Sequence, residues 1–263
     1  MASSANQSST ALPRGVAPLR AGAGQSFLWR RLHSLTGIVP VGLFLLEHLI
    51  SNAEAVNGVA AYNAQVKFLT GLPFRLWLEV FGIFIPLLFH ALYGTYIWWR
   101  GENNVIDYSM KGNWYYTLQR YSGLVVFAYV AWHLYTMRFT GVHLTEHYDA
   151  SFWKVQNELA NPLALGFYVL GMVAACWHFG YGLFLFAVKW GFASGPKAQK
   201  RLQLASIALS LALMVVGLYT MYAFVTAKAQ QRDPAWDKPA VESEQAPEQS
   251  RSIPESVPSS PAR

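Results

Sequence analysis

Apolar residues in this chain gather into long blocks that short polar stretches separate. Five blocks reach the length of about 20 residues that a helix needs to cross a bilayer, at about 1.5 Å of rise per residue. The expected spans are residues 32–51, 74–99, 115–137, 163–188 and 202–226. The pattern therefore predicts an all-α integral membrane protein with five transmembrane helices.

The segments outside these blocks divide the chain further. Residues 1–26 are rich in Ser, Ala and Gly, and residues 228–263 combine proline with mixed charge, so both have too little apolar surface to pack. We expect a flexible leader, a membrane domain over residues 27–227 and a disordered tail. The loops near 52–73 and 138–162 contain aromatic residues and are expected to carry surface helices.

Composition excludes several classes of protein. Of 263 residues, 53% are hydrophobic and 13% are charged, about half the charge of a typical soluble domain. The single cysteine, Cys176, rules out an intramolecular disulfide, an iron–sulfur cluster and a thiolate zinc site. The chain also lacks a glycine-rich phosphate loop, and its basic residues do not form one patch that nucleic acid would need.

The distribution of Lys and Arg predicts the orientation. Basic residues concentrate before the first span, between the second and third, and between the fourth and fifth; they are Arg14, Arg20, Arg30, Arg31, Arg100, Lys111, Arg120, Lys189, Lys197, Lys200 and Arg201. Because cytoplasmic loops carry the excess of basic residues, the N-terminus is expected in the cytoplasm and the C-terminus outside, in a bacterial cytoplasmic membrane.

A cleaved signal peptide is an alternative for the first span. The pair Arg30-Arg31, the apolar stretch 35–50 and the small residues of 53–55 imitate a twin-arginine signal. Glu47 and His48 near the end of the apolar stretch, together with the long leader, favour a retained helix.

Four of the seven histidines lie well inside predicted spans, where ionisable groups are costly and usually functional. Counted from the cytoplasmic end at about 1.5 Å per residue, His48 lies roughly 24 Å deep, His133 about 22 Å, His90 about 14 Å and His178 about 15 Å. The depths define an inner pair, His90 with His178, and an outer pair, His48 with His133. Because low-spin haem iron takes an imidazole on each face, two stacked pairs predict two haems b. The fifth span has no histidine and no charge, so it is expected to lie outside a four-helix haem-binding core.

Small and planar residues lie near these histidines. They suit the approach of a porphyrin, although tight helix packing and interface anchoring are alternative roles; they include Gly37, Gly42, Gly82, Gly94, Gly123, Gly171, Gly180, Gly182, Trp98, Trp132 and Trp177.

Several runs resemble the di-haem, five-helix cytochrome b subunit of succinate:menaquinone reductases and of the related quinol:fumarate reductases. The resemblance covers residues 27–226 and is carried by residues 27–37, Pro40, Gly42, Phe44, His48-Leu49, Phe89-His90, Tyr93-Gly94, residues 117–120, Gly123, Trp132-His133, His178 and Gly180. It implies the same two ligand pairs as the depths do.

The resemblance also implies the setting. The expected partners are a flavoprotein subunit that oxidises succinate with FAD and an iron–sulfur subunit, in addition to membrane lipid and a quinone, with menaquinone as the expected acceptor. No catalytic residue is expected in this chain. Cys176 replaces the glutamate that proton-conducting fumarate reductases of this family carry two residues before the fourth-helix ligand. This difference favours the succinate-oxidising direction, with a quinol:fumarate reductase subunit as the near alternative and a haem-free proton- or metal-relaying transporter as the far one.

Weaker candidates lie at the ends of the spans. Arg31, His33 and Ser34 lie at the cytoplasmic mouth of the first helix and Arg120 just inside the third, where they are candidates to contact haem propionates or quinone oxygens, or else to snorkel. Residues 143–147 spell H-x-x-E-H, a zinc-protease pattern, but a solvated loop is the favoured interpretation.

Overall fold

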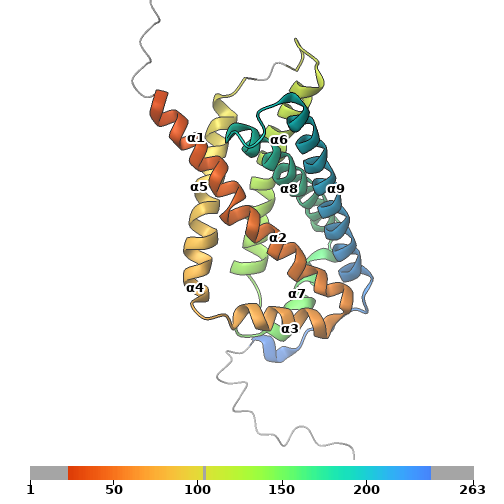
Figure 1. Cartoon of the computed structure of the whole chain (residues 1–263). Coiled ribbons are helices and arrows are strands. Elements are labelled where there is room, and N and C mark those ends of the chain that lie inside the picture. The colour runs from red at the N-terminus through yellow and green to blue at the C-terminus, as the bar shows by residue number, and fades with distance from the viewer. Residues whose placement is uncertain (1–22, 103–104, 238–263) are drawn as a thin grey trace, which may run out of the picture.

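A computed structural model describes residues 23–102 and 105–237, and Figure 1 shows long helices side by side with a smaller cap at one end. The helices are α1 (Ala23–Ile38), α2 (Pro40–Ala53), α3 (Val59–Thr70), α4 (Arg75–Trp77), α5 (Ile85–Arg100), α6 (Lys111–Leu134), α7 (Ser151–Leu159), α8 (Pro162–Lys189) and α9 (Pro196–Thr226). Short 3₁₀ segments are η1 (Glu54–Asn57), η4 (Tyr148–Ala150) and η5 (Pro234–Asp237), and π segments are η2 (Leu78–Phe84) and η3 (Tyr135–Phe139). Both described ranges are without strands, as the apolar pattern predicts.

The first predicted span is one continuous helical segment, Ser26–Asn57. Pro40 begins α2, yet Val39 N donates to Leu35 O and Leu43 N donates to Val39 O, so the hydrogen-bond ladder continues across the junction. Because proline lacks an N–H, the ladder loses one hydrogen bond at Pro40, but the helix does not end there.

Within the described residues, four helical segments are long and apolar enough to cross a membrane: Ser26–Asn57, Arg75–Arg100, Pro162–Lys189 and Pro196–Thr226. The predicted third span corresponds to α6 with η3, which packs along α8 but is not among the four. Its tyrosines and tryptophans, with Gln119 and Arg120, make it less apolar than its neighbours. The fivefold span count therefore stays a prediction.

Glycines bring α8 and α9 together. A Cβ on Gly180 would lie 2.1 Å from Ser210 Oγ and 2.8 Å from Ser206 O, and one on Gly217 would lie 2.5 Å from Met172 Sδ. Close approach of this kind is what small residues provide between membrane helices. The span that corresponds to α9 has no histidine that could bind a haem, so we expect it to pack around the other helices. In the structure α9 packs closely against α8.

The cap is formed by the short helices α3 and α7 at one end of the bundle (Figure 1). A buried apolar cluster joins these helices to the bundle. Phe152 on α7 is fully buried, and the Tyr62 ring on α3 lies 5.0 Å from the Phe224 ring on α9. Because α3 and α7 lie in the loops 52–73 and 138–162, the expected surface helices are present.

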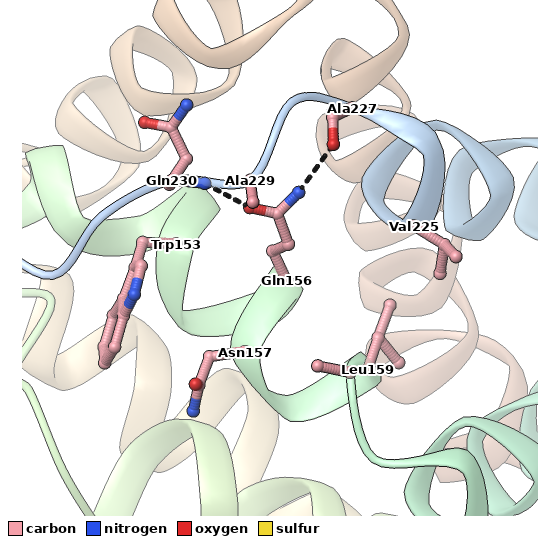
Figure 2. Close-up of a pocket in the computed structure, with 9 residues that line it drawn as sticks. Trp153, Gln156, Asn157, Leu159, Val225, Ala227, Ala229 and Gln230 are labelled. Carbon is pink, nitrogen blue, oxygen red and sulfur yellow. Dashed lines mark hydrogen bonds between the residues drawn. The ribbon is translucent and has the colours of Figure 1, made fainter.

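The start of the expected disordered tail is ordered instead. Gln156 on α7 donates to the carbonyls of Phe224 and Ala227 and accepts from Gln230 N, beside a cavity of about 330 Å³ (Figure 2). The Trp236 ring lies 5.4 Å from that of Trp153, and its Nε1 donates to Asp149. These aromatic and polar anchors stabilise residues 228–237 against α7, and residues 238–263 lie outside the described residues.

The leader also differs from the expectation at its end. Helix α1 begins at Ala23 rather than after residue 26, so the last residues of the expected leader are helical. Residues 1–22 lie outside the described residues.

Replacing Trp236 by alanine should loosen the cap. The aromatic contact and the hydrogen bond each contribute on the order of 1 kcal/mol, so the backbone amides of residues 149–156 should exchange roughly tenfold faster. Hydrogen–deuterium exchange with mass spectrometry measures this, with the exposed neighbour Gln231→Ala as control. Equal protection in both variants would contradict the packing of this segment.

Candidate functional site

The structure brings the predicted inner pair together. His90 on α5 and His178 on α8 have ring centroids 6.1 Å apart and ring planes at 81°. Both residues are partly buried. The structure thus places the two rings next to each other, and their role as ligands of one haem stays a prediction.

Main-chain carbonyls of neighbouring helices fix the tautomer of these two rings. His90 Nδ1 lies 2.9 Å from His33 O on α1, and His178 Nδ1 lies 3.1 Å from Gln119 O on α6. Because a carbonyl only accepts, each Nδ1 carries the proton in the neutral ring, and each Nε2 keeps its lone pair. Second-shell bonds of this kind orient histidines that bind a metal.

The outer pair forms nearer the cap. His48 on α2 and His133 on α6 have ring centroids 5.7 Å apart and planes at 78°. Asn52 Nδ2 donates to His48 O at 2.7 Å and lies 3.4 Å from His48 Nε2, so this nitrogen is an acceptor. His133 Nδ1 is buried and has no hydrogen-bond partner in the structure.

Glycines make room for the inner rings. A Cβ on Gly37 would lie 2.2 Å from His90 Cε1, and one on Gly123 would lie 2.8 Å from His178 Cε1. These glycines therefore seat imidazoles, a role that the sequence did not distinguish from helix packing. Gly42 and Gly171 instead face the rings of Phe179 and Tyr129.

The spacing fits one iron between each pair, and at the inner pair the tautomer also leaves both Nε2 lone pairs free for it. Two metal–imidazole bonds of about 2 Å laid end to end, with the distance from each nitrogen to its ring centre added, give a centroid separation of about 6 Å. The observed values of 6.1 and 5.7 Å agree with this geometry. Unprotonated ring nitrogens also avoid burying charge in hydrocarbon.

The weaker candidates gather near the inner pair. The His33 ring stacks on His90 with centroids 4.1 Å apart. The Arg31 guanidinium lies over the Trp190 ring at 4.9 Å, and Trp190 Nε1 donates to Ser34 Oγ. These residues join α1 to Trp190, the residue that follows α8.

Arg120 is bound to main-chain carbonyls, and its role as a propionate contact stays a prediction. Its guanidinium donates to the carbonyls of Trp98, Gly101 and Glu102, so it caps the C-terminal end of α5, the helix that carries His90. Only Nε is left without a partner.

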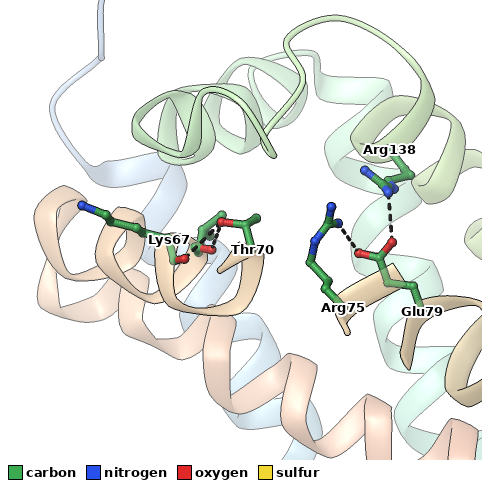
Figure 3. A network of polar contacts seen from close by, with 6 residues as sticks. Lys67, Thr70, Arg75, Glu79 and Arg138 are labelled. Carbon is green, nitrogen blue, oxygen red and sulfur yellow. Dashed lines mark hydrogen bonds and ion pairs between the residues drawn. The ribbon is translucent and has the colours of Figure 1, made fainter. Parts of the chain in front are cut away.

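Sequence reasoning did not identify an ionic network beside the outer pair. Glu79 accepts from Arg75 at 2.6 Å and from Arg138 at 2.9 Å, which ties η2 to η3 (Figure 3). Lys154 on α7 is nearly buried, and burial lowers its pKa, with Arg138 lowering it further and Glu158 acting in the opposite direction. In the sequence these residues appear only as charges beside apolar runs. Charged residues that anchor a helix at the membrane interface give the same pattern, so the sequence did not single out the network.

The H-x-x-E-H pattern does not form a helical zinc motif. Residues 143–147 lie in turns before η4. The described residues contain no group of three or more His, Cys, Asp or Glu side chains that could hold a metal ion.

Buried imidazole pairs in a bundle of membrane helices are the architecture of membrane cytochromes b. Residues 106–217 match the family model described as "Succinate dehydrogenase/Fumarate reductase transmembrane subunit". The chain is 40% identical over 201 residues to the succinate dehydrogenase cytochrome b558 subunit of Bacillus subtilis, a match that spans 76% of this chain and 98% of that protein. It is 26% identical over 223 residues to the fumarate reductase cytochrome b subunit of Wolinella succinogenes, spanning 78% and 84% of the two chains.

The chain belongs to the family of membrane cytochrome b subunits of succinate dehydrogenases and fumarate reductases. It is thus one subunit of an oxidoreductase complex, and membership implies haem b as its prosthetic group. Haem b supplies reversible one-electron chemistry at iron, while the protein fixes its ligands and surroundings.

Filling the space at Gly37 should disturb the inner site selectively. In Gly37→Ala the new methyl group would overlap the His90 ring, so we expect loss of at least half of one haem component in the reduced-minus-oxidised spectrum of the purified complex. Gly82→Ala is the control, because a Cβ there meets nothing within 4 Å. Equal haem content in the two variants would contradict the seating of His90 by Gly37.

Proposed function

We propose that this chain is the di-haem membrane anchor of a succinate dehydrogenase, and that it passes electrons from an iron–sulfur subunit through an inner and an outer haem b to menaquinone. The observation that supports this most strongly is the presence of two separate imidazole pairs at ligand spacing. His90 and His178 would hold the inner haem, and His48 and His133 the outer one.

The arrangement of the first helix supports its retention in the membrane. α1 packs against α5 and α8, and α2 packs against α9 and carries His48. A helix that supplies a buried imidazole is expected to remain part of the protein. We propose five spans, with the cap outside the cell and the N-terminus in the cytoplasm, as the basic residues predict.

The succinate-oxidising direction is favoured by α8. Cys176 is fully buried on this helix, and its Sγ lies 3.7 Å from Met172 Sδ. A thiol in a sulfur-lined site offers no carboxylate to carry protons past the outer pair. The flavoprotein that oxidises succinate with FAD and the iron–sulfur subunit would dock at the cytoplasmic end.

Single substitutions test the pairing. His90→Ala and His178→Ala should each abolish the same haem component in low-temperature difference spectra, because each iron needs both axial nitrogens. His48→Ala and His133→Ala should abolish the other. His143→Ala, in the cap loop, is the control and should leave both components. Loss of different components within one pair would refute the assignment, and an absence of b-type bands from the unsubstituted complex would favour a haem-free transporter.

The angle between ring planes gives a second test. Nearly perpendicular imidazole planes, as at 81° and 78°, make two of the iron d orbitals almost equal in energy. The ferric form of the complex should therefore give strongly anisotropic EPR signals dominated by a low-field feature. A rhombic spectrum with three resolved features, typical of parallel planes, would contradict this geometry.

The side of quinone reduction has an energetic consequence. If electrons cross from the negative cytoplasm to a positive exterior, the potential assists them by about 2.3 kcal/mol per charge and 100 mV. Succinate oxidation by menaquinone in intact cells should slow when an uncoupler collapses the potential, whereas reduction of a soluble dye by the isolated complex should not. Uncoupler insensitivity would place quinone reduction near Ser34 and Trp190 instead.

A further inference from the structure

Lys154 makes an unusually complete set of contacts for a lysine near a membrane surface. Its Nζ donates to Met137 O at 2.9 Å, to Thr140 O at 2.8 Å and to Val142 O at 2.8 Å, and the residue is only 7% exposed. Three acceptors match the three donors of an ammonium group. The Lys154 ammonium group is therefore bound entirely by main-chain carbonyls of one segment, residues 137–142.

That segment is the end of the helix that carries His133. Met137 lies one helical turn after His133, within the π segment η3 that continues α6. The last carbonyls of a helix lack intrahelical partners and form the negative end of its dipole. Lys154 satisfies carbonyls there and places a positive charge one turn from an axial-ligand position.

Helix α7 is a firm support for this contact. Asn63 on α3 accepts from Ser151 Oγ at 2.8 Å and from Phe152 N at 3.0 Å, which fixes the start of α7. Gln156 binds the end of α9. Residues on both sides of Lys154 in α7 are therefore anchored by other helices. For this reason the position of Lys154 depends little on its own contact with the end of α6.

The opposite end of the bundle has a matching arrangement. Arg120 caps the C-terminal end of α5, the helix of His90, through three carbonyls. At the C-terminal end of each of these two helices, main-chain carbonyls thus accept hydrogen bonds from a cationic side chain of another element. The two ends lie at opposite sides of the bundle (Figure 1).

We propose that Lys154 is a positioning residue for His133, holding the end of α6 and supplying positive charge to the outer haem. This inference rests on the proposed di-haem function. Ferrous haem with two neutral imidazoles carries one positive charge less than the ferric form, so a nearby cation favours reduction. Removing Lys154 should lower the potential of the outer haem and leave the inner one unchanged.

Two substitutions separate charge from tethering in the purified complex. In Lys154→Met both are lost: the outer midpoint potential should fall, and the amides of residues 134–142 should exchange roughly tenfold faster. Lys154→Gln retains amide donors, so exchange should be partly restored while the outer potential stays low. Spectroelectrochemical titration and hydrogen–deuterium exchange measure the two effects.

Lys67→Met is the matched control. Lys67 is an exposed cation of the same cap, 4.9 Å above the Tyr148 ring, and its removal should move neither haem potential nor exchange in 134–142. An unchanged outer potential in Lys154→Met, or an equal fall of both potentials, would overturn the role of Lys154 while the unsubstituted complex still shows two haem components. Absence of an outer component from the unsubstituted complex would instead overturn the proposed function and this inference with it.

Discussion

An imidazole N–H buried in hydrocarbon is costly without a hydrogen-bond partner, and this constraint shapes the inner pair of histidines. Water is absent there, and an unsatisfied polar group costs several kcal/mol. His90 and His178 meet it with main-chain carbonyls of α1 and α6 rather than with groups on their own helices. Each of these two rings is thus held by contact between two helices, and Gly37 and Gly123 allow these contacts because they lack a side chain.

The outer pair is organised differently, since the short helices of the cap determine its surroundings. His48 is linked through Asn52 to the Tyr62 hydroxyl on α3. The end of the His133 helix is held by Glu79 through Arg138 and by α7 through Lys154. The proposed inner haem therefore depends on packing within the bundle, and the proposed outer haem depends on the cap.

The all-helical membrane class, the helical blocks and the pairing of histidines could be predicted from the sequence, because depth in a membrane helix follows directly from residue count. Residues 228–237 were expected to be disordered, but in the structure Trp236 packs on Trp153, a contact between distant residues that composition does not reveal. Arg120 was a candidate to contact a haem propionate, and the structure shows that it caps α5, whereas Lys154 was not singled out although its Nζ binds main-chain carbonyls. Local sequence gives charge and depth, whereas the acceptor that a cation reaches depends on tertiary packing.

Haem stoichiometry tests the central claim most directly, because it requires no substitution. The haem b content of the purified, intact complex, measured as the pyridine haemochrome and divided by the amount of this chain from amino-acid analysis, should be two per chain. A ratio of one would show that only one imidazole pair binds iron, and a ratio of zero would contradict the haem-based function altogether.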